Sequence, residues 1–276
     1  MYSPLQTTVL DGLKIAYRMQ QPERPGAADV LMIHGWASSG RMWQVMMDGL
    51  SPHYRCWALD LPGFGDSDKP ENGWYSIRQY IELVAAFCEA MNITRPHVIG
   101  HSMGGMIALG LAAEHPMPLG RVVAINPLVS GRTYIVQLLN TRPFGTVFLT
   151  LGRWAWPLTT SSWLTPWLIR QHGVPMRRIR EDWAKTSPHA AVTSAGAING
   201  HDLTEKLPGV TVPTLIVIGS RDLTAPNAEG RLAGRLIPGA RLEVLPSGHL
   251  PTDDLPDEIF RLTNDFLAEE RQPWTT

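Results

Sequence analysis

A serine lies inside the run Gly100-His101-Ser102-Met103-Gly104, which follows an apolar stretch and precedes a segment of helical period. The run fits the pattern G-x-S-x-G, whose glycines allow a sharp strand-to-helix turn that pushes the serine outward. A serine hydroxyl is a poor nucleophile at neutral pH, so it needs a nearby base and an acid that orients the base. The sequence therefore predicts nucleophilic catalysis by Ser102, with Gly100 and Gly104 as supporting residues of its turn.

The base and the acid are expected downstream, at the ends of further strands. His249 follows the apolar run ARLEVLPSG, and Gly248 permits a tight turn before it. Asp222 follows the apolar run TLIVIGSR in the same way. Because the carboxyl ends of parallel strands meet at one edge of a sheet, all three side chains can converge there. We therefore predict Ser102 as the nucleophile, Asp222 as the acid and His249 as the base.

Other residues compete for these roles. Asp222 could instead cap the turn that follows it. His34, His101 and His201 are alternative bases, but His34 and His101 each adjoin a glycine in a tight turn and are interpreted as scaffold around the site. Another strand is followed by Asn126, whose amide cannot carry the negative charge that stabilises an imidazolium.

A second chemical element is the turn His34-Gly35-Trp36, after the apolar run DVLMI. An acyl-transfer enzyme needs backbone N–H groups that converge on the developing oxyanion, and removing one such donor costs about 3 kcal/mol. We predict the backbone amides of Met103 and Trp36 as these donors. Gly35 is expected to allow close approach, with His34 as a supporting residue of the turn.

The surrounding pattern alternates short apolar runs with segments of helical period, which is typical of a parallel α/β sheet. The runs are apolar on both faces, as expected where helices cover both sides of the sheet. We predict strands within 28–35, 54–63, 96–102, 121–127, 214–222 and 240–249. Helices are predicted over 76–92 and 103–116.

Residues 128–200 break this rhythm. Five of the ten tryptophans lie there: Trp154, Trp156, Trp163, Trp167 and Trp183. Residues 127–200 contain seven Arg and one Lys but only one Glu and one Asp, which gives a net charge of +6. We interpret 128–200 as a basic, aromatic-rich helical cap over a core made of 1–127 and 201–276. The arginines could recruit an anionic substrate or an acidic carrier protein, or could simply be solvated.

Composition limits the class of protein. The 276 residues are 44% hydrophobic and 18% charged, enough for a sizeable core and unlike a disordered chain. A net charge of −1 argues against a nucleic-acid partner. Cys56 and Cys88 lack the spacing of a zinc or redox site and are expected to be reduced core thiols. With neither an evident signal peptide nor an apolar stretch of about 18 residues, we expect a cytoplasmic protein without a membrane span.

The motifs together resemble the α/β-hydrolase superfamily, in its branch of capped small bacterial serine esterases and related hydrolases. The resemblance rests on HGW (34–36), DLPGFGDSDKP (60–70), GHSMGG (100–105), GSRDLTAP (219–226) and SGH (247–249). It implies a mostly parallel sheet of about eight strands flanked by helices, a helical cap after strand six, and hydrolysis without a metal or other cofactor. Ser102 stands where relatives that hydrolyse haloalkanes or epoxides carry Asp, which argues against both activities.

The expected function is hydrolysis of small-molecule carboxylic esters through an acyl-serine intermediate. The same three residues could instead cleave a lactone, a thioester or a carbon–carbon bond between carbonyl groups. The resemblance also includes carrier-protein methyl ester esterases, although those tend towards GWSLGG where this chain has GHSMGG. A non-catalytic ligand receptor with this fold is the alternative outside the enzymes.

Overall fold

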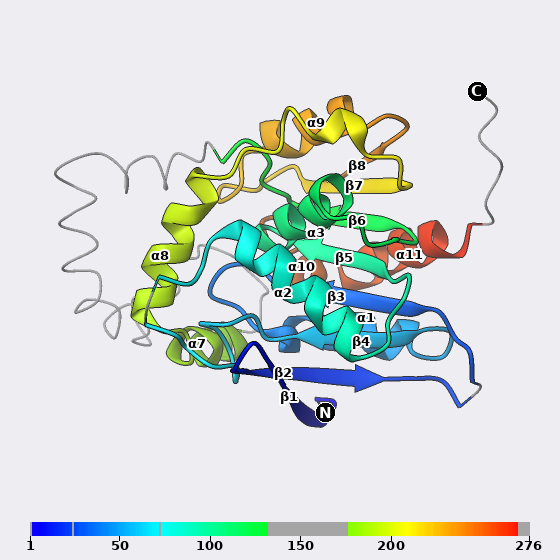
Figure 1. Cartoon of the computed structure of the whole chain (residues 1–276). Helices are drawn as coiled ribbons and strands as arrows, with labels where there is room; N and C mark the ends of the chain where they lie inside the picture. The colour runs from blue at the N-terminus through cyan, green and yellow to red at the C-terminus, as the bar shows by residue number, and fades with distance from the viewer. Residues whose placement is uncertain (1, 24, 72, 132–175, 270–276) are drawn as a thin grey trace, which may run out of the picture.

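The computed structural model describes residues 2–23, 25–71, 73–131 and 176–269 (Figure 1). Its centre is one eight-stranded sheet in the order β1-β2-β4-β3-β5-β6-β7-β8. In chain order the strands are β1 (Leu5–Leu10), β2 (Leu13–Gln20), β3 (Asp29–Ile33), β4 (Arg55–Leu59), β5 (His97–His101), β6 (Val122–Ile125), β7 (Thr214–Gly219) and β8 (Arg241–Leu245). Strands β3 to β8 are parallel to one another, and β2 is antiparallel to both β1 and β4. The predicted α/β-hydrolase fold, a mostly parallel sheet of about eight strands, is thus confirmed.

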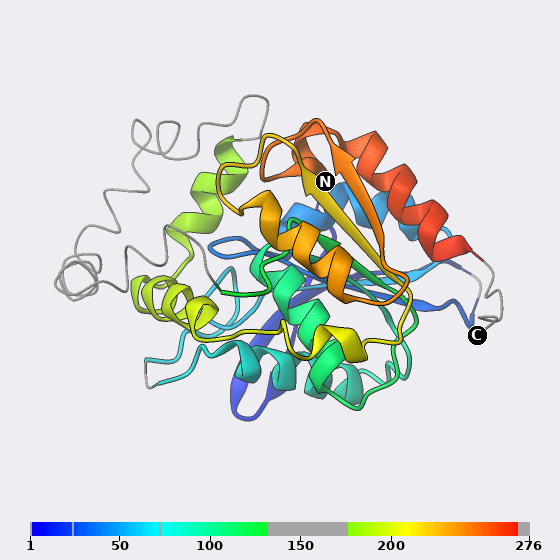
Figure 2. The ribbon, with the colours of Figure 1, turned by 90° about the horizontal axis from the view of Figure 1, so that it is seen from above.

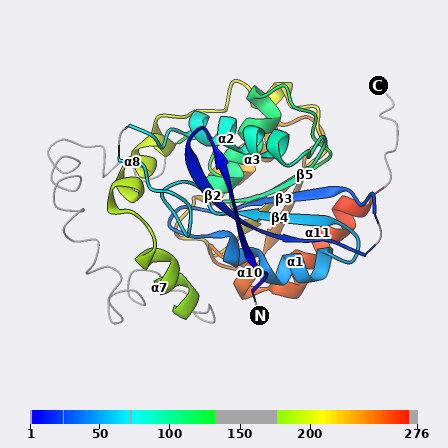
Figure 3. The same cartoon turned by 60° about the horizontal axis from the view of Figure 1, so that its bottom comes forward.

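Helices cover both faces of the sheet, as Figure 3 shows with α2 and α3 on one side and α1 and α11 on the other. The described helices are η1 (Gly40–Trp43), α1 (Gln44–Leu50), α2 (Ile77–Ala90), α3 (Met103–Glu114), α7 (Met176–Ala184), α8 (Pro188–Asn199), η2 (Leu207–Gly209), α9 (Asn227–Leu236), α10 (Pro251–Asp254) and α11 (Pro256–Ala268). Successive residues of β3 enter opposite cores, since Leu31 packs in the cluster under α2 and α3 and Met32 in the cluster under α1 and α11. This arrangement explains why Val30–Ile33 of β3 are all apolar.

The six predicted strand runs correspond to β3 to β8, and each run extends beyond its strand at the carboxyl end. The extra residues form the loops at one edge of the sheet. Ser102 follows β5, Asn126 follows β6, Asp222 lies three residues after β7, and His249 four residues after β8. Strands β5 to β8 are neighbours in the sheet, so these loops lie side by side.

Helices α7 and α8 lie between β6 and β7 in the chain and belong to the predicted cap. Figures 1 and 2 show both helices at one end of the sheet, with α8 in yellow-green and α11 in red on the far side. The division into core (1–127, 201–276) and cap (128–200) stays a prediction, because residues 132–175 lie outside the described residues. Four of the five cap tryptophans, all except Trp183, fall in that segment.

The two cysteines are free and buried, as the sequence predicts. Burial raises the pKa of each thiol, Cys56 and Cys88, to about 12, so neither is a reactive thiolate. Among the described residues, no helix has the length and apolar character needed to cross a membrane.

Candidate active site

Ser102 lies on a strained turn between β5 and α3. Its backbone has φ 54° and ψ −117°, and its amide donates a hydrogen bond to the Ile125 carbonyl at 2.9 Å. The flanking glycines leave no room for a side chain: a Cβ on Gly100 would lie 2.1 Å from the Gly104 carbonyl oxygen, and one on Gly104 would lie 2.2 Å from that of Ile33. The glycines of the motif are therefore required for the close approach of β5, α3 and β3.

Gly104→Ala is expected to destabilise the protein by about 3 kcal/mol or to prevent folding, because the new methyl group meets a backbone carbonyl that cannot move freely. The free energy of unfolding in urea measures the effect. Gly196→Ala is the matched control: a Cβ there meets nothing within 4 Å, and Ala in a helix is about 0.5–1 kcal/mol better than Gly. Equal stability of the two variants would contradict the packing described for the Ser102 turn.

The side chains of Ser102, His249 and Asp222 form one chain of hydrogen bonds. His249 Nε2 lies 3.1 Å from Ser102 Oγ, and His249 Nδ1 lies 2.7 Å from Asp222 Oδ2. With an ionised Asp222 the Nδ1 proton faces the carboxylate, so Nε2 presents a lone pair to the serine hydroxyl. These are the geometry and the tautomer that a nucleophile, base and acid require.

Both oxygens of Asp222 are used. Oδ1 accepts hydrogen bonds from the amides of Thr224 at 2.7 Å and Ala225 at 3.0 Å, while Oδ2 faces His249. Asp222 therefore caps the following turn and orients the histidine at once. Burial raises the pKa of Asp222, but the hydrogen bond and charge of His249 and the two amides outweigh burial, and the net shift is downward. The carboxyl group stays ionised at neutral pH.

The competing histidines are occupied elsewhere. His34 Nε2 accepts a hydrogen bond from the Leu61 amide at 2.9 Å, and its Nδ1 donates to the Gly35 carbonyl at 2.7 Å. His201 lies 3.2 Å from a carboxylate oxygen of Glu114. The ring nitrogen that faces Ser102 Oγ is that of His249, and His34 holds the turn that contains Gly35, as the sequence predicts.

The predicted oxyanion donors lie beside Ser102. Met103 is the first residue of α3, where an amide has no partner within its own helix. A Cβ on Gly35 would come within 3.2 Å of Ser102 Cβ and 2.8 Å of His101 Nδ1, so the turn before Trp36 packs directly on the nucleophile. The roles of Trp36 and Met103 as oxyanion donors stay predictions.

The Trp36 side chain connects this turn to the predicted cap. Its Nε1 donates a hydrogen bond to the Ala191 carbonyl of α8 at 2.8 Å. Its ring also meets Trp183 edge to face, with centroids 6.4 Å apart. One of the five tryptophans of the predicted cap, Trp183, thus contacts the turn that follows β3.

Ion pairs also connect α7 to the predicted core, and every side chain in them except that of Glu181 is at most 10% exposed. Arg41, in the helix after the Trp36 turn, donates hydrogen bonds to Asp182 at 2.6 Å and Glu181 at 2.7 Å. Arg178 donates to Asp253 at 2.6 Å and lies 3.8 Å from Asp182. Asp253 belongs to α10, which begins two residues after the catalytic candidate His249. We call Arg41, Glu181, Asp182, Arg178 and Asp253 the cap–core ion pairs.

Arg178→Ala is expected to lower the free energy of unfolding by about 3 kcal/mol, because it leaves the Asp253 carboxylate, whose side chain is 10% exposed, without its cation, whereas Asp182 keeps Arg41. Denaturation in urea measures the loss. Arg177→Ala is the matched control, because the Arg177 side chain is 88% exposed and that of Arg178 only 6%. Arg177 pairs with Glu181 along the helix, and its removal should lower the free energy of unfolding by less than about 1 kcal/mol. An equal fall in the free energy of unfolding for both variants would show that the contribution of these ion pairs to stability does not depend on their burial.

The basic charge of the described cap is largely balanced within the chain. Arg177, Arg178 and Lys185 each pair with a carboxylate, the last with Asp66 at 2.6 Å. The other arginines of the predicted cap, except Arg180, lie outside the described residues. Within the described residues there is also no group of three or more His, Cys, Asp or Glu side chains placed to hold a metal ion.

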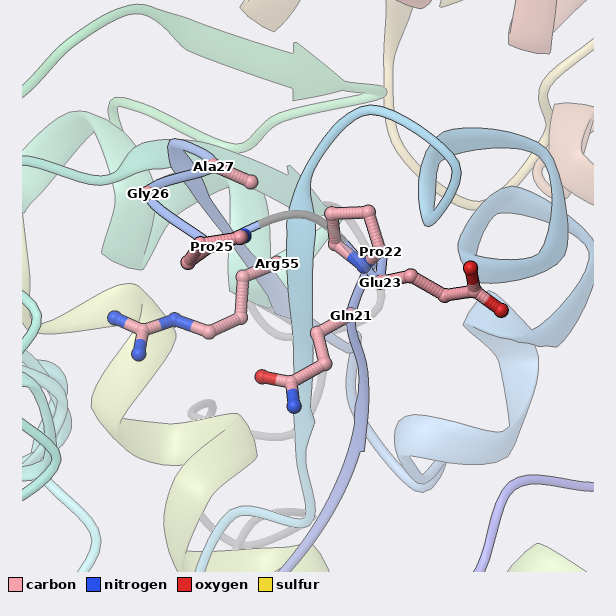
Figure 4. Close-up of a pocket in the computed structure, with 7 residues that line it drawn as sticks. All are labelled: Gln21, Pro22, Glu23, Pro25, Gly26, Ala27 and Arg55. Atoms are coloured by element: carbon pink, nitrogen blue, oxygen red, sulfur yellow. The ribbon is translucent and has the colours of Figure 1, made fainter.

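A surface hollow of about 350 Å³ is lined by none of Ser102, Asp222 and His249 (Figure 4). Gln21, Glu23 and Arg55 line it, and Figure 4 shows their polar ends diverging instead of converging on one point. Arg55 is already paired with Asp29, its neighbour across β3 and β4. The hollow lies at the amino ends of these parallel strands, opposite the edge that carries Ser102, and holds no catalytic constellation.

Known proteins are similar along most of the chain. A magnesium-chelatase 30 kDa subunit from Rhodobacter capsulatus is 28% identical, covering 88% of this chain and 88% of that protein. A putative carbamate hydrolase, RutD, from Pantoea ananatis is 27% identical over 92% and 93% of the two chains. Among solved structures, an enol-lactonase from Burkholderia xenovorans superposes with a TM-score of 0.77 at 25% identity, over 96% of this chain and 100% of that one.

A family model also matches most of the chain. The model described as the alpha/beta hydrolase fold matches residues 30–254, which include the Ser102 turn, Asp222 and His249. A fold alone permits many activities, but here it coincides with a hydrogen-bonded Ser, His and Asp at the expected strand ends. The chain is a hydrolase that belongs to the α/β-hydrolase fold family.

Proposed function

We propose that this hydrolase cleaves carboxylic esters of small molecules through an acyl-serine intermediate, with Ser102 as nucleophile, His249 as base and Asp222 as orienting acid. The observation that carries the proposal is the unbroken hydrogen-bond chain from Asp222 Oδ2 through the His249 ring to Ser102 Oγ. The strained Ser102 backbone adds support, because a left-handed serine between buried glycines is held there only by the surrounding structure.

The reaction follows from this geometry. Ser102 Oγ attacks the ester carbonyl carbon while its proton moves to His249 Nε2, and the carbonyl oxygen becomes an oxyanion facing the Met103 and Trp36 amides. The carbon–oxygen bond to the alcohol then breaks, and the alcohol takes the proton from His249. Water attacks the acyl-serine with His249 again as base, which releases the acid and restores Ser102. The acyl group passes from the alcohol oxygen to Ser102 Oγ and then to water without a change of oxidation state, so the proposed reaction requires no redox cofactor.

The same residues suit related bonds. A lactone is an internal ester, and the similar enol-lactonase structure makes lactones the first alternative. The carbamate hydrolase relative adds carbamates to the substrates to be tested. For a carrier-bound methyl ester, the internal pairing of Arg177, Arg178 and Lys185 removes part of the positive surface that docking on acidic protein would use.

The test is hydrolysis of a chain-length series of p-nitrophenyl esters at neutral pH without added metal, with Ser102→Ala as the blank. A fluorophosphonate that labels activated serines is applied to the same samples. We expect both hydrolysis and labelling, each absent from the Ser102→Ala blank. Labelling without ester hydrolysis would redirect the assignment to lactones, carbamates, thioesters, diketones or carrier-bound esters. Absence of both would favour a non-catalytic ligand receptor.

A further inference from the structure

The backbone carbonyl of His249 is held by two side chains outside the triad. His101 Nε2 lies 2.7 Å from that oxygen, and Asn126 Nδ2 lies 3.0 Å from it. Both are buried, and they come from the carboxyl ends of β5 and β6. The base therefore receives two hydrogen bonds at its backbone in addition to the two that its ring makes.

Asn126 joins the loop of the base to the loop of the acid. Its Oδ1 accepts from the Gly219 amide at 2.7 Å, at the end of the strand that leads to Asp222. Its Nδ2 donates to His249 and also lies 3.3 Å from the Gly248 carbonyl. The amide orientation is fixed by its partners, because one side faces an N–H group and the other faces carbonyl oxygens.

The backbone of Asn126 is as constrained as its side chain. The residue has φ 45°, a left-handed conformation in which Asn is tolerated better than most residues. Its amide donates to the Val217 carbonyl of β7 at 2.7 Å. Asn126 is therefore anchored to β7 before its side chain reaches the loop of His249.

His101 supplies a donor that carries no charge. Burial, followed by repulsion from His249, lowers the pKa of His101 to about 3, so the ring is neutral at neutral pH. Since Nε2 faces a carbonyl oxygen, the single ring proton lies on Nε2. The His101 and His249 rings are 4.7 Å apart, so a charged side chain at 101 would repel the imidazolium that forms during catalysis.

We propose that Asn126 and His101 are positioning residues that fix the His249 carbonyl and, through it, the distance between His249 Nε2 and Ser102 Oγ. The proposal rests on the proposed function of Ser102 and His249. Both residues bond the His249 carbonyl, whereas the ring nitrogens of His249 face Asp222 and Ser102, so the loss of either residue acts on the alignment of the base. Misplacement of a catalytic group by about 1 Å costs about 100-fold in rate.

The experiment compares four variants with wild type: Asn126→Gly, Asn126→Asp, His101→Leu and His101→Gln. Asn126→Gly keeps the left-handed backbone and removes the side chain, and we expect kcat to fall about 100-fold with KM little changed. Asn126→Asp keeps the acceptor for Gly219 but sets a carboxylate against two carbonyls near His249. We expect a similar loss and an acid limb of the pH–rate profile moved to higher pH, because the added charge favours protonated His249.

His101→Leu removes the donor and is expected to lower kcat about 100-fold, whereas the Gln side chain places an amide N–H close to the position of Nε2 and should restore most of the activity. This difference cannot arise from packing alone, since Leu is the better buried side chain. The matched controls are Asn92→Gly, an exposed left-handed asparagine with φ 55°, and His53→Leu, an exposed histidine. Neither should change kcat.

The outcomes separate the two proposals. Folded variants with the kcat and pH profile of an active wild type would overturn the positioning role and leave the triad intact. A wild type that neither hydrolyses esters nor is labelled by the fluorophosphonate would overturn the proposed function, and the positioning role with it. If Asn126 variants fail to fold, the comparison of His101→Gln with His101→Leu decides: equal activity of these two contradicts the proposal.

Discussion

Ser102→Ala and His249→Ala are each expected to lower kcat for ester hydrolysis by on the order of 10⁶-fold. The two side chains act as one unit, because the hydroxyl is activated only by the lone pair 3.1 Å away on His249 Nε2. The double variant should therefore be little slower than either single one. Measurement of kcat for the three variants on the fastest p-nitrophenyl ester checks both the size of the losses and their failure to add.

His201→Ala provides the control for loss of a histidine. His201 pairs with Glu114 and is separate from Ser102, so its removal should leave kcat unchanged within about twofold. A His249→Ala variant that keeps more than about 1% of the activity would show that another base serves Ser102. His101 is then the first residue to examine, since its ring lies against that of His249.

The parallel strands could be predicted from the sequence because they are buried on both faces. In β3, Leu31 and Met32 point into different cores, so the run Val30–Ile33 is apolar and stands out between polar segments. The hairpin of β1 and β2 gave no such signal, since most of β1 is exposed and includes polar residues. The turn between them, Asp11-Gly12 with positive φ at both residues, matches a hairpin signal that the sequence does contain.

The triad could be predicted because each member follows a strand in the order expected of the family. The residues around it depend on which strands are neighbours, and one sequence does not reveal that order. Asn126 was judged from sequence only as a possible acid and excluded for lack of charge. Its place between β5 and β7 shows why an amide suits it: one side chain must both accept from Gly219 and donate to His249.

The cap–core ion pairs also could not be predicted from the sequence. The basic excess of 128–200 indicated an anionic partner or a solvated surface. Arg178 instead meets Asp253, which is 75 positions away in the chain and adjoins the loop of His249. A charge count cannot distinguish an exposed cation from one buried against a distant carboxylate, because both contribute the same sign to the total.

Asp222→Asn is expected to lower kcat by about 10⁴-fold while leaving the fold intact. The backbone amides of Thr224 and Ala225 fix the orientation of the new side-chain amide, because they require an oxygen at the Oδ1 position. The NH₂ group of Asn must then face His249 Nδ1 and donate to it. That moves the ring proton to Nε2, where it points at Ser102 and leaves no lone pair to take the serine proton.

The matched control is Asp202→Asn, an exposed carboxylate that accepts hydrogen bonds from Thr204 just as Asp222 accepts from Thr224. This variant should keep the wild-type kcat, and its urea denaturation curve should match that of the wild type. Fluorophosphonate labelling of Ser102 should slow in parallel with kcat in Asp222→Asn, since both reactions need the same lone pair. A loss smaller than about tenfold would mean that the orientation and charge of the base come from a residue other than Asp222, and the assignment of the acid would have to be withdrawn.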